Sequence, residues 1–130
     1  MSVQKSEPGK GWVFNLNDDD QGIHRKLAEG ITTRIFPGAE VMISVVRVEP
    51  GTAGKPHSHV EEQWGVLLEG ECVRIQGEEE VLMKAGDFWH TPSGVPHTIR
   101  TGDSGAVILD IFAPPREEYM KPGEGFADKG

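Results

Sequence analysis

Three histidines and one glutamine are the residues of this chain whose types and spacing could bind a metal ion. His57 and His59 stand one residue apart in the stretch HSHVEEQ, which ends at Gln63, and His97 follows later in PSGVPHT. Side chains alternate along an extended strand, so the first two imidazoles point to the same side and can reach one cation at roughly 2.0–2.1 Å. We expect His97 to supply a third nitrogen donor from a distant strand.

Strand parity also divides the residues that follow His59. Glu61 and Gln63 fall on the face of the histidines and Glu62 on the opposite face, provided that no bulge intervenes. Three neutral imidazoles and a neutral carboxamide leave the charge of a divalent cation uncompensated, whereas a glutamate ligand would cancel one unit of it. Gln63 therefore suits a site that attracts an anionic substrate, and Glu61 stays open as the alternative fourth ligand.

The elements that must position these residues are short strands. The chain contains 17 glycines and 9 prolines, and the stretches between them are rich in Val, Ile, Phe and Thr. Many short antiparallel strands predict an all-β sandwich or a closed barrel. The ten stretches expected to be strands are 11–16, 22–28, 31–36, 40–49, 62–69, 71–76, 80–85, 87–91, 97–101 and 106–113.

Length, charge and cysteine content limit the class of protein. A chain of 130 residues predicts one domain, with a barrel core over about 31–113 and termini, 1–10 and 117–130, that fray or lie across a neighbouring subunit. The formal net charge of -8 disfavours nucleic acid and anionic membranes as partners. The lone Cys72 excludes an internal disulfide, and without a signal segment or a long apolar run we expect a cytoplasmic protein.

The spacing of the glycines, proline and histidines resembles the two motifs of the cupin superfamily. The first departure is Gln63, where the motif usually has Glu, and the second is Thr101, where it usually has Asn. The positions that carry the resemblance are Gly51, His57, His59, position 63 and Gly70 in the first motif, and Gly86, Pro92, Gly94 and His97 in the second.

The cupin resemblance implies a double-stranded β-helix, or jelly-roll barrel, with a metal ion inside. It implies that the ligands are His57, His59, Gln63 and His97. The ligand types admit one divalent transition metal ion, which could be nickel, iron, zinc, manganese or copper, so the identity of the metal stays open.

Polar residues near the last expected strand are the candidates for substrate binding. In AVILDIFAPPREEY, Asp110 and Phe112 share a face, and a carboxylate facing apolar walls needs a partner or a function. Arg116, after two prolines, could hold a substrate carboxylate with its planar guanidinium. An Asp110–Arg116 ion pair that anchors the C-terminus is the equally weighted alternative.

Together, HSHVEEQ and DIFAPPREEY resemble the small cupins of pectin and alginate catabolism that convert 4,5-unsaturated monouronates to linear keto acids. This narrower resemblance implies substrate handling by Asp110, Phe112 and Arg116, and catalysis of a non-redox isomerisation or lysis of a small sugar acid. Two other classes remain open. An iron-dependent dioxygenase could use the same three histidines, and a non-catalytic cupin could bind a metal or small ligand as a sensor.

The remaining aromatic and cysteine residues have structural interpretations. We expect Trp64, Phe88 and Trp89 in the core or the pocket wall, although exposed Trp or Phe on one barrel face would favour oligomerisation. His90 is expected in a structural or exposed position, yet it shares the parity of Phe88 and could face the cavity as a hydrogen-bond donor. Cys72 lacks a neighbouring base for thiol chemistry.

A homodimer is expected, since cupin barrels commonly bury an outer sheet face.

Overall fold

Short antiparallel strands wrap around one interior in this chain, and a computed structural model describes them for residues 2–6 and 10–125. Within these residues the single helical element is a four-residue 3-10 turn, so no helix there could cross a membrane. The elements are β1 (Ile23–Ala28), β2 (Ile31–Pro37), β3 (Met42–Val48), β4 (Glu62–Gln76), β5 (Glu79–Lys84), β6 (Phe88–Thr91), β7 (His97–Arg100), β8 (Ala106–Ala113), η1 (Glu117–Met120) and β9 (Gly123–Glu124).

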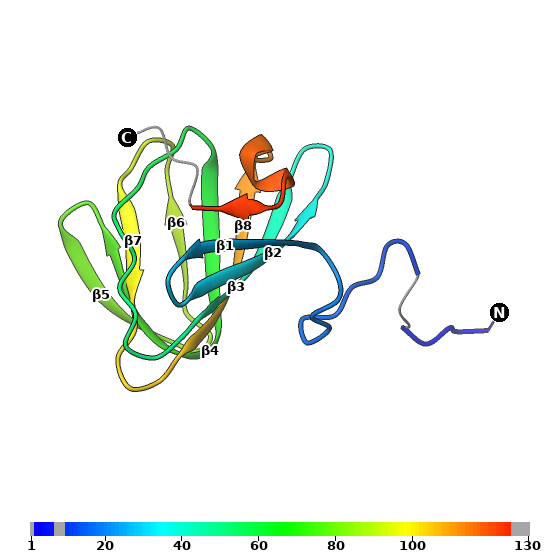
Figure 1. The fold of residues 1–130 in the computed structure, drawn as a ribbon, viewed down its shortest axis with the longest axis horizontal. Helices are drawn as coiled ribbons and strands as arrows, with labels where there is room; N and C mark the ends of the chain where they lie inside the picture. Colours follow the sequence, from blue (N-terminus) through cyan, green and yellow to red (C-terminus); the bar gives the residue numbers. More distant parts are fainter. Residues whose placement is uncertain (1, 7–9, 126–130) are drawn as a thin grey trace.

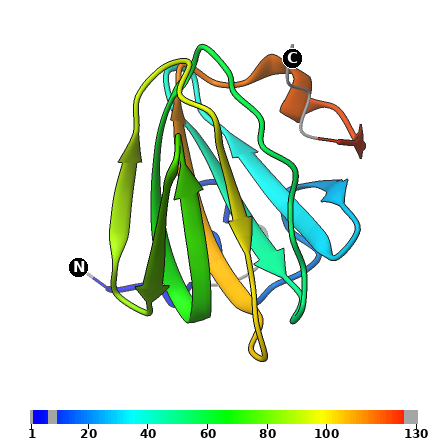
Figure 2. The ribbon, with the colours of Figure 1, turned by 90° about the vertical axis from the view of Figure 1, so that its left-hand side faces the viewer.

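The strands form one curved sheet around the interior (Figure 1). Its order is β5-β4-β8-β3-β2-β1-β9, and β6 and β7 also pair with β4. The long strand β4 holds the two sides together, because its first half pairs with β6 and β8 and its second half with β5 and β7. Figure 2, turned by 90°, shows how these strands enclose the space between them. The result is the all-β jelly-roll barrel that the sequence predicts.

Strand β4 replaces two expected strands, 62–69 and 71–76, with one. The turn expected at Glu69–Glu71 is instead a bend at Gly70, which has φ 82° and lies so close to the neighbouring strand that a Cβ would be 1.8 Å from Gly105 O. A glycine is therefore required there on both conformational and steric grounds. Residues 11–16 form turns and extended chain rather than the predicted strand, and the sheet begins at Ile23, before the expected start of the core.

Inward-facing side chains of the strands form the core. Alternation places the apolar inward residues of β2, β3 and β8 against β4 and β6. Its fully buried members include Ile31, Ile35, Met42, Leu67, Cys72, Ile108 and Phe112. Gln63, Arg74 and Asp110 share this inward face, so the interior is polar on the side of β4.

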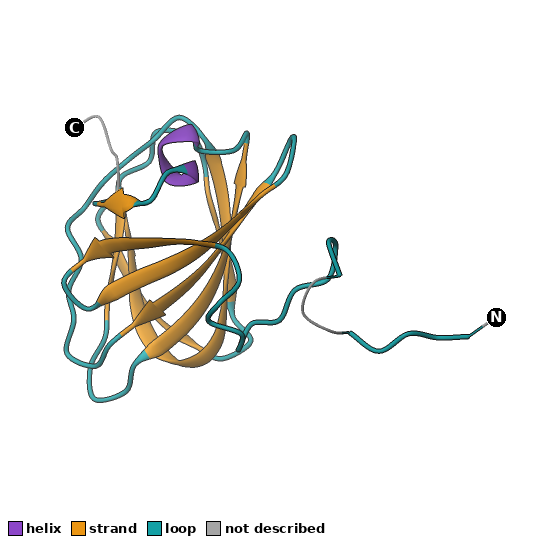
Figure 3. Cartoon of the chain, turned by 45° about the vertical axis from the view of Figure 1, so that its right-hand side comes forward, coloured by secondary structure: helices purple, strands orange, loops and turns teal. Residues whose placement is uncertain are grey.

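The segment after β8 packs over one end of the barrel, as Figure 3 shows for η1. The Arg25 guanidinium of β1 holds it by donating to the carbonyls of Glu118, Lys121, Glu124 and Gly125 at 2.8–3.2 Å. Tyr119 is only 2% exposed beneath it. Residues 117–125 therefore pack on the barrel of their own chain, whereas 117–130 was expected to fray or to lie across a neighbouring subunit. Residues 126–130 lie outside the described part.

The outward face of the same strands is apolar and partly exposed. Trp64 is 44% and Phe88 69% exposed, so the expectation that both lie in the core or the pocket wall is wrong. His90 also points outward, where its Nε2 contacts Glu62 Oε2 at 2.5 Å, so it does not face the cavity. The hydrophobicity of these aromatics suggested burial, but their strand parity opposes that of Gln63 and decides their side.

Candidate metal centre

The three candidate histidines meet inside the barrel although His57 and His97 are forty residues apart. Their backbones form an isolated antiparallel bridge, in which His57 N donates to His97 O at 3.0 Å and His97 N donates to His57 O at 2.9 Å. The ring centroids are 4.5 Å apart for His57 and His97, 5.0 Å for His59 and His97, and 6.3 Å for His57 and His59. This bridge joins the loop of the first pair to β7.

In each of these histidines, Nδ1 is hydrogen-bonded to a backbone carbonyl oxygen. Because a carbonyl oxygen only accepts, each Nδ1 carries the ring proton and each Nε2 keeps its lone pair. This is the tautomer in which an imidazole binds a metal through Nε2. The contacts are His57 to Lys55 O at 3.0 Å, His59 to Glu61 O at 2.9 Å, and His97 to Val95 O at 2.9 Å.

Burial keeps the three imidazoles neutral. It lowers the pKa of His57 to about 4 and that of His97 to about 2. The pKa of His59 is lowered as well, first by burial and then by the positive charge of Arg116. All three rings are therefore uncharged at pH 7, as metal ligands must be.

Gln63 directs its carbonyl oxygen at a histidine lone pair. The side chain is buried, and Oε1 lies 3.0 Å from Nε2 of His59. The amide is also hydrogen-bonded to Asp110, and an ionised carboxylate only accepts, so the amide nitrogen faces Asp110 and the oxygen faces His59. Two acceptors this close repel unless a proton or a cation lies beside them. Two ligands bound at about 2.1 Å and at right angles would be about 3.0 Å apart, so this pair fits a metal ion.

Two further observations bear on that fit. Nε2 of His97 is buried and has no hydrogen-bond partner among the described residues. In the same part of the chain, no three His, Cys, Asp or Glu side chains are grouped closely enough to hold a metal ion as they stand. The rings of His57 and His59 are the most widely separated, so an ion would have to draw them together. The fourth candidate, Gln63, is an amide.

Glu61 lies on the other side of His59. Its Oε1 is 3.6 Å from Nδ1 of His59 and 3.6 Å from Nε of Arg116, with which it forms an ion pair. The carboxylate thus faces the proton-bearing side of the imidazole, whereas Gln63 faces Nε2. Glu62 points outward, as strand parity predicts. Of the three side chains, Gln63 is the one placed toward the lone pair of His59.

The candidate substrate residues lie next to the histidines. Asp110 faces inward on β8, where burial raises its pKa to about 6, against the opposing effects of Arg74 and Gln63. Phe112 packs edge-on against the ring of His59, with centroids 5.5 Å apart. Arg116 is 1% exposed, and its guanidinium carbon is 5.8 Å from the centroid of Phe112. The structure therefore brings Asp110, Phe112 and Arg116 into the same interior.

Tyr119 is a site residue that the sequence did not reveal. It lines the same cavity as His57, and its ring centroid is 4.2 Å from the guanidinium carbon of Arg116. Burial raises the pKa of its hydroxyl to about 12, so it is a hydrogen-bond donor at neutral pH. The polar composition of 117–130 predicted a loose terminus rather than a site residue. The segment is held by Arg25, which lies on a strand about a hundred residues earlier, so the local sequence does not show this contact.

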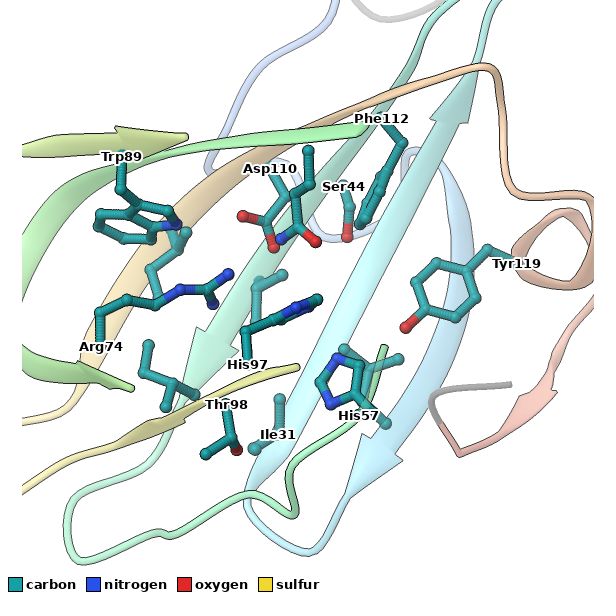
Figure 4. Close-up of a pocket in the computed structure, with 15 residues that line it drawn as sticks. Ile31, Ser44, His57, Arg74, Trp89, His97, Thr98, Asp110, Phe112 and Tyr119 are labelled. Carbon is teal, nitrogen blue, oxygen red and sulfur yellow. The ribbon is translucent and has the colours of Figure 1, made fainter. Parts of the chain in front are cut away.

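Arg74 and Trp89 line the far side of the cavity (Figure 4). Arg74 is 7% exposed, and its guanidinium carbon lies 5.4 Å from the centroid of the Trp89 ring. The burial of Trp89 confirms its expected place in the pocket wall. The cavity has a volume of about 40 Å³, enough for a few water molecules. The sequence offered one signal that Arg74 faces the interior: in ECVRIQ it has the same strand parity as Cys72.

A small β-barrel with neutral imidazoles gathered inside it defines a class of proteins with an internal candidate metal centre. Residues 44–112 match the family model described as a cupin domain. The chain belongs to the cupin family, and its two motifs with His57, His59 and His97 fall within the matched region.

Proteins similar to this chain include enzymes and a protein of pectin degradation. The chain is 32% identical over 117 residues to oxalate decarboxylase OxdC of Bacillus subtilis (strain 168), covering 82% of this chain but only 30% of that protein. It is 29% identical over 105 residues to pectin degradation protein KdgF of Dickeya dadantii (strain 3937), covering 78% and 94%. The crystal structure of an RmlC-like cupin from Shewanella frigidimarina NCIMB 400 has the same fold, with a TM-score of 0.70, 24% identity and coverage of 78% and 91%.

Proposed function

We propose that this cupin is a metal-dependent isomerase that opens the ring of a 4,5-unsaturated uronate to give the linear keto acid, without a change of redox state. Support comes from its similarity to the pectin degradation protein over most of both chains. The observation that carries the proposal is that His57, Gln63, His97 and Asp110 line one cavity. The candidate metal ligands and an ionisable carboxyl group therefore face the same space.

The proposed ligand set is neutral. A divalent transition metal ion held by His57, His59, Gln63 and His97 would supply a Lewis acid that polarises an oxygen of the substrate. With no ligand charge to offset it, the positive charge at the site would attract an acid into a chain of net charge -8. Glu61 is left to its ion pair with Arg116.

The residues next to the proposed metal site have separate parts in this reaction. Arg116 binds the carboxylate of the uronate, and Phe112 packs against the face of the sugar ring. Asp110 accepts the proton of the anomeric hydroxyl as the ring C–O bond breaks and an aldehyde forms. The ring oxygen leaves as an enolate, and the proton that Asp110 took up is delivered to the enolate carbon, so the product is the keto isomer of the substrate.

The test is turnover of 4,5-unsaturated galacturonate by the metal-loaded protein, followed by NMR. We expect stoichiometric conversion to the keto acid, loss of activity after dialysis against a chelator, and recovery when one divalent metal is restored. An intact substrate after prolonged incubation with fully loaded protein would refute the proposed reaction.

A dioxygenase is the second candidate, because three histidines with open coordination positions also suit iron-dependent oxygen chemistry. An oxygen electrode separates the two classes. The isomerase consumes no oxygen during turnover and works equally well under nitrogen. Oxygen uptake that keeps pace with substrate loss would instead favour the dioxygenase.

We also propose that two copies of the chain associate through the outward apolar face of β4, β6 and β8. Trp64 and Phe88 are 44% and 69% exposed on this face, and such a patch is costly to leave in water. Residues that face outward with them include Val66, Leu109 and Ile111. Light scattering after size-exclusion chromatography should give the mass of a dimer; a monomer at micromolar concentration would contradict this.

A further inference from the structure

Five buried polar atoms around one cavity have no hydrogen-bond partner among the described residues. Native proteins pair the large majority of such atoms, so their concentration here indicates that the cavity is built for polar groups. The atoms are Arg74 Nε, Trp89 Nε1, His97 Nε2, Thr98 Oγ1 and Asp110 Oδ1, and their residues all line the cavity of Figure 4. The proposed metal would account for the histidine atom alone.

Gly65 explains how two of these atoms come together. A Cβ on this glycine of β4 would lie 2.5 Å from Trp89 Nε1 and 2.7 Å from Asp110 Oδ1. The two atoms are therefore no farther apart than the sum of these distances. One oxygen atom can span that gap with two ordinary hydrogen bonds. Because glycine has no side chain, Trp89 and Asp110 can both approach β4 this closely.

The chemistry of the two atoms selects the group that fits between them. The indole nitrogen of Trp89 only donates, and the carboxylate of Asp110 in its ionised form only accepts. A carbonyl oxygen could accept from Trp89 but would have no proton for Asp110, and a carboxylate would be repelled by it. A hydroxyl group accepts from the first and donates to the second.

Arg74 stands beside this pair in a fixed orientation. Its Nη2 donates to Thr91 Oγ1 at 2.8 Å, which in turn donates to Gln76 Oε1 at 2.6 Å. The guanidinium also packs over the ring of Trp89. The positive charge of the Arg74 guanidinium attracts the Asp110 carboxylate, and both residues line the cavity.

We propose that Trp89 Nε1 and Asp110 Oδ1, above Gly65 and beside Arg74, form a subsite for a hydroxyl group of the substrate. This inference rests on the proposed function, in which Arg116 holds the carboxylate of a sugar acid. The hydroxyl subsite adds a second point of recognition, so the protein distinguishes hydroxylated acids from simple acids of the same ring size.

Binding to two matched probes tests the subsite. D-galacturonate carries a carboxylate and hydroxyls, whereas tetrahydropyran-2-carboxylate has the ring and the carboxylate alone. Calorimetry with metal-loaded protein should show tighter binding of galacturonate. Trp89→Phe keeps the aromatic ring but removes the donor, and it should weaken galacturonate by about 3- to 10-fold, the value of one hydrogen bond, while leaving the second probe unchanged. Trp12→Phe, at a side chain that is 79% exposed and does not line the cavity, is the control and should change neither.

A second variant keeps the test decisive if Trp89→Phe does not fold. Gly65→Ala places a methyl group between the two atoms and should reduce galacturonate binding with the same selectivity. Equal binding of both probes by the wild-type protein, no binding of either, or equal weakening of both by the variants would each overturn the subsite.

Turnover measured in parallel separates this inference from the proposed function. If the wild-type protein binds galacturonate selectively but leaves 4,5-unsaturated galacturonate intact, the subsite stands and the proposed reaction fails. If the unsaturated sugar is converted and Trp89→Phe has wild-type kcat and KM, the reaction stands and the subsite fails.

Discussion

The inward face of β4, β6 and β8 mixes polar and apolar side chains, whereas their outward face exposes large aromatic ones. Gln63, Trp89 and Asp110 face the interior, where Trp89 Nε1 and Asp110 Oδ1 have no hydrogen-bond partner among the described residues. Their sequence neighbours Trp64 and Phe88 face outward and are largely apolar. A barrel selected for stability alone would place the apolar residues inside, because burying unpaired polar groups is costly. The two faces therefore carry two separate proposals, chemistry in the interior and contact between copies of the chain on the exterior.

The largest effect should come from the inward face, at Asp110. Asp110→Asn keeps the shape of the side chain but cannot accept a proton, so turnover of 4,5-unsaturated galacturonate should fall by about 10²- to 10⁴-fold. Metal content measured by mass spectrometry should stay at the wild-type level. A variant with wild-type kcat would show that Asp110 is not the proton carrier.

Cys72 reports how well the inward face of β4 is separated from solvent. It is 2% exposed, and burial raises the pKa of its thiol to about 11 from an ordinary 9.0, which lowers the thiolate fraction at pH 8 by about 100-fold. Alkylation by iodoacetamide at pH 8 should therefore be slower by at least this factor than in urea-denatured protein. Equal rates in the two states would mean that the interior opens freely.

Gln63→Glu tests the charge of the inward face. The new carboxylate would cancel one unit of the cation's charge and would face Asp110 across the hydrogen bond that the amide now makes. We expect metal to bind more tightly and KM for the anionic substrate to rise by about 10-fold, an effect comparable to one charge-assisted hydrogen bond. Gln21→Glu, far from the cavity on a surface turn, adds the same charge and should leave KM unchanged. An unchanged KM for Gln63→Glu would remove the argument for a neutral ligand.

The outward face should show the smallest effect on chemistry and the clearest one on assembly. Phe88→Asp introduces a charge into the exposed apolar patch, so light scattering should shift toward the monomer mass. Turnover per bound metal should stay within about 2-fold, because the side chain points away from the cavity. Glu78→Asp, on the exposed turn before β5, is the control for a surface substitution. A Phe88→Asp protein that remains a dimer would place the interface elsewhere.

Local sequence was a good guide where one strand decides the outcome. Alternation along HSHVEEQ predicted that Gln63 lies inside and Glu62 outside, and the strand at 31–36 is close to β2. The predicted burial of Trp64 and Phe88 was wrong, because their hydrophobicity was given more weight than their strand parity. For Arg74, the apolar Val73 and Ile75 on the other face of β4 offered the more conventional inward set. The strand alone could not say which set faces the interior.

The sequence by itself determined the cupin fold, since its glycines and prolines end the strands and its alternating residues form them. It also determined which residues could bind a metal, because donor type and strand parity are local properties. Only the tertiary structure decided that Arg25 holds the segment of Tyr119 over the barrel and that Trp89 and Asp110 meet over Gly65. These contacts join strands that are distant in sequence, and their geometry follows from the closure of the barrel rather than from any single strand.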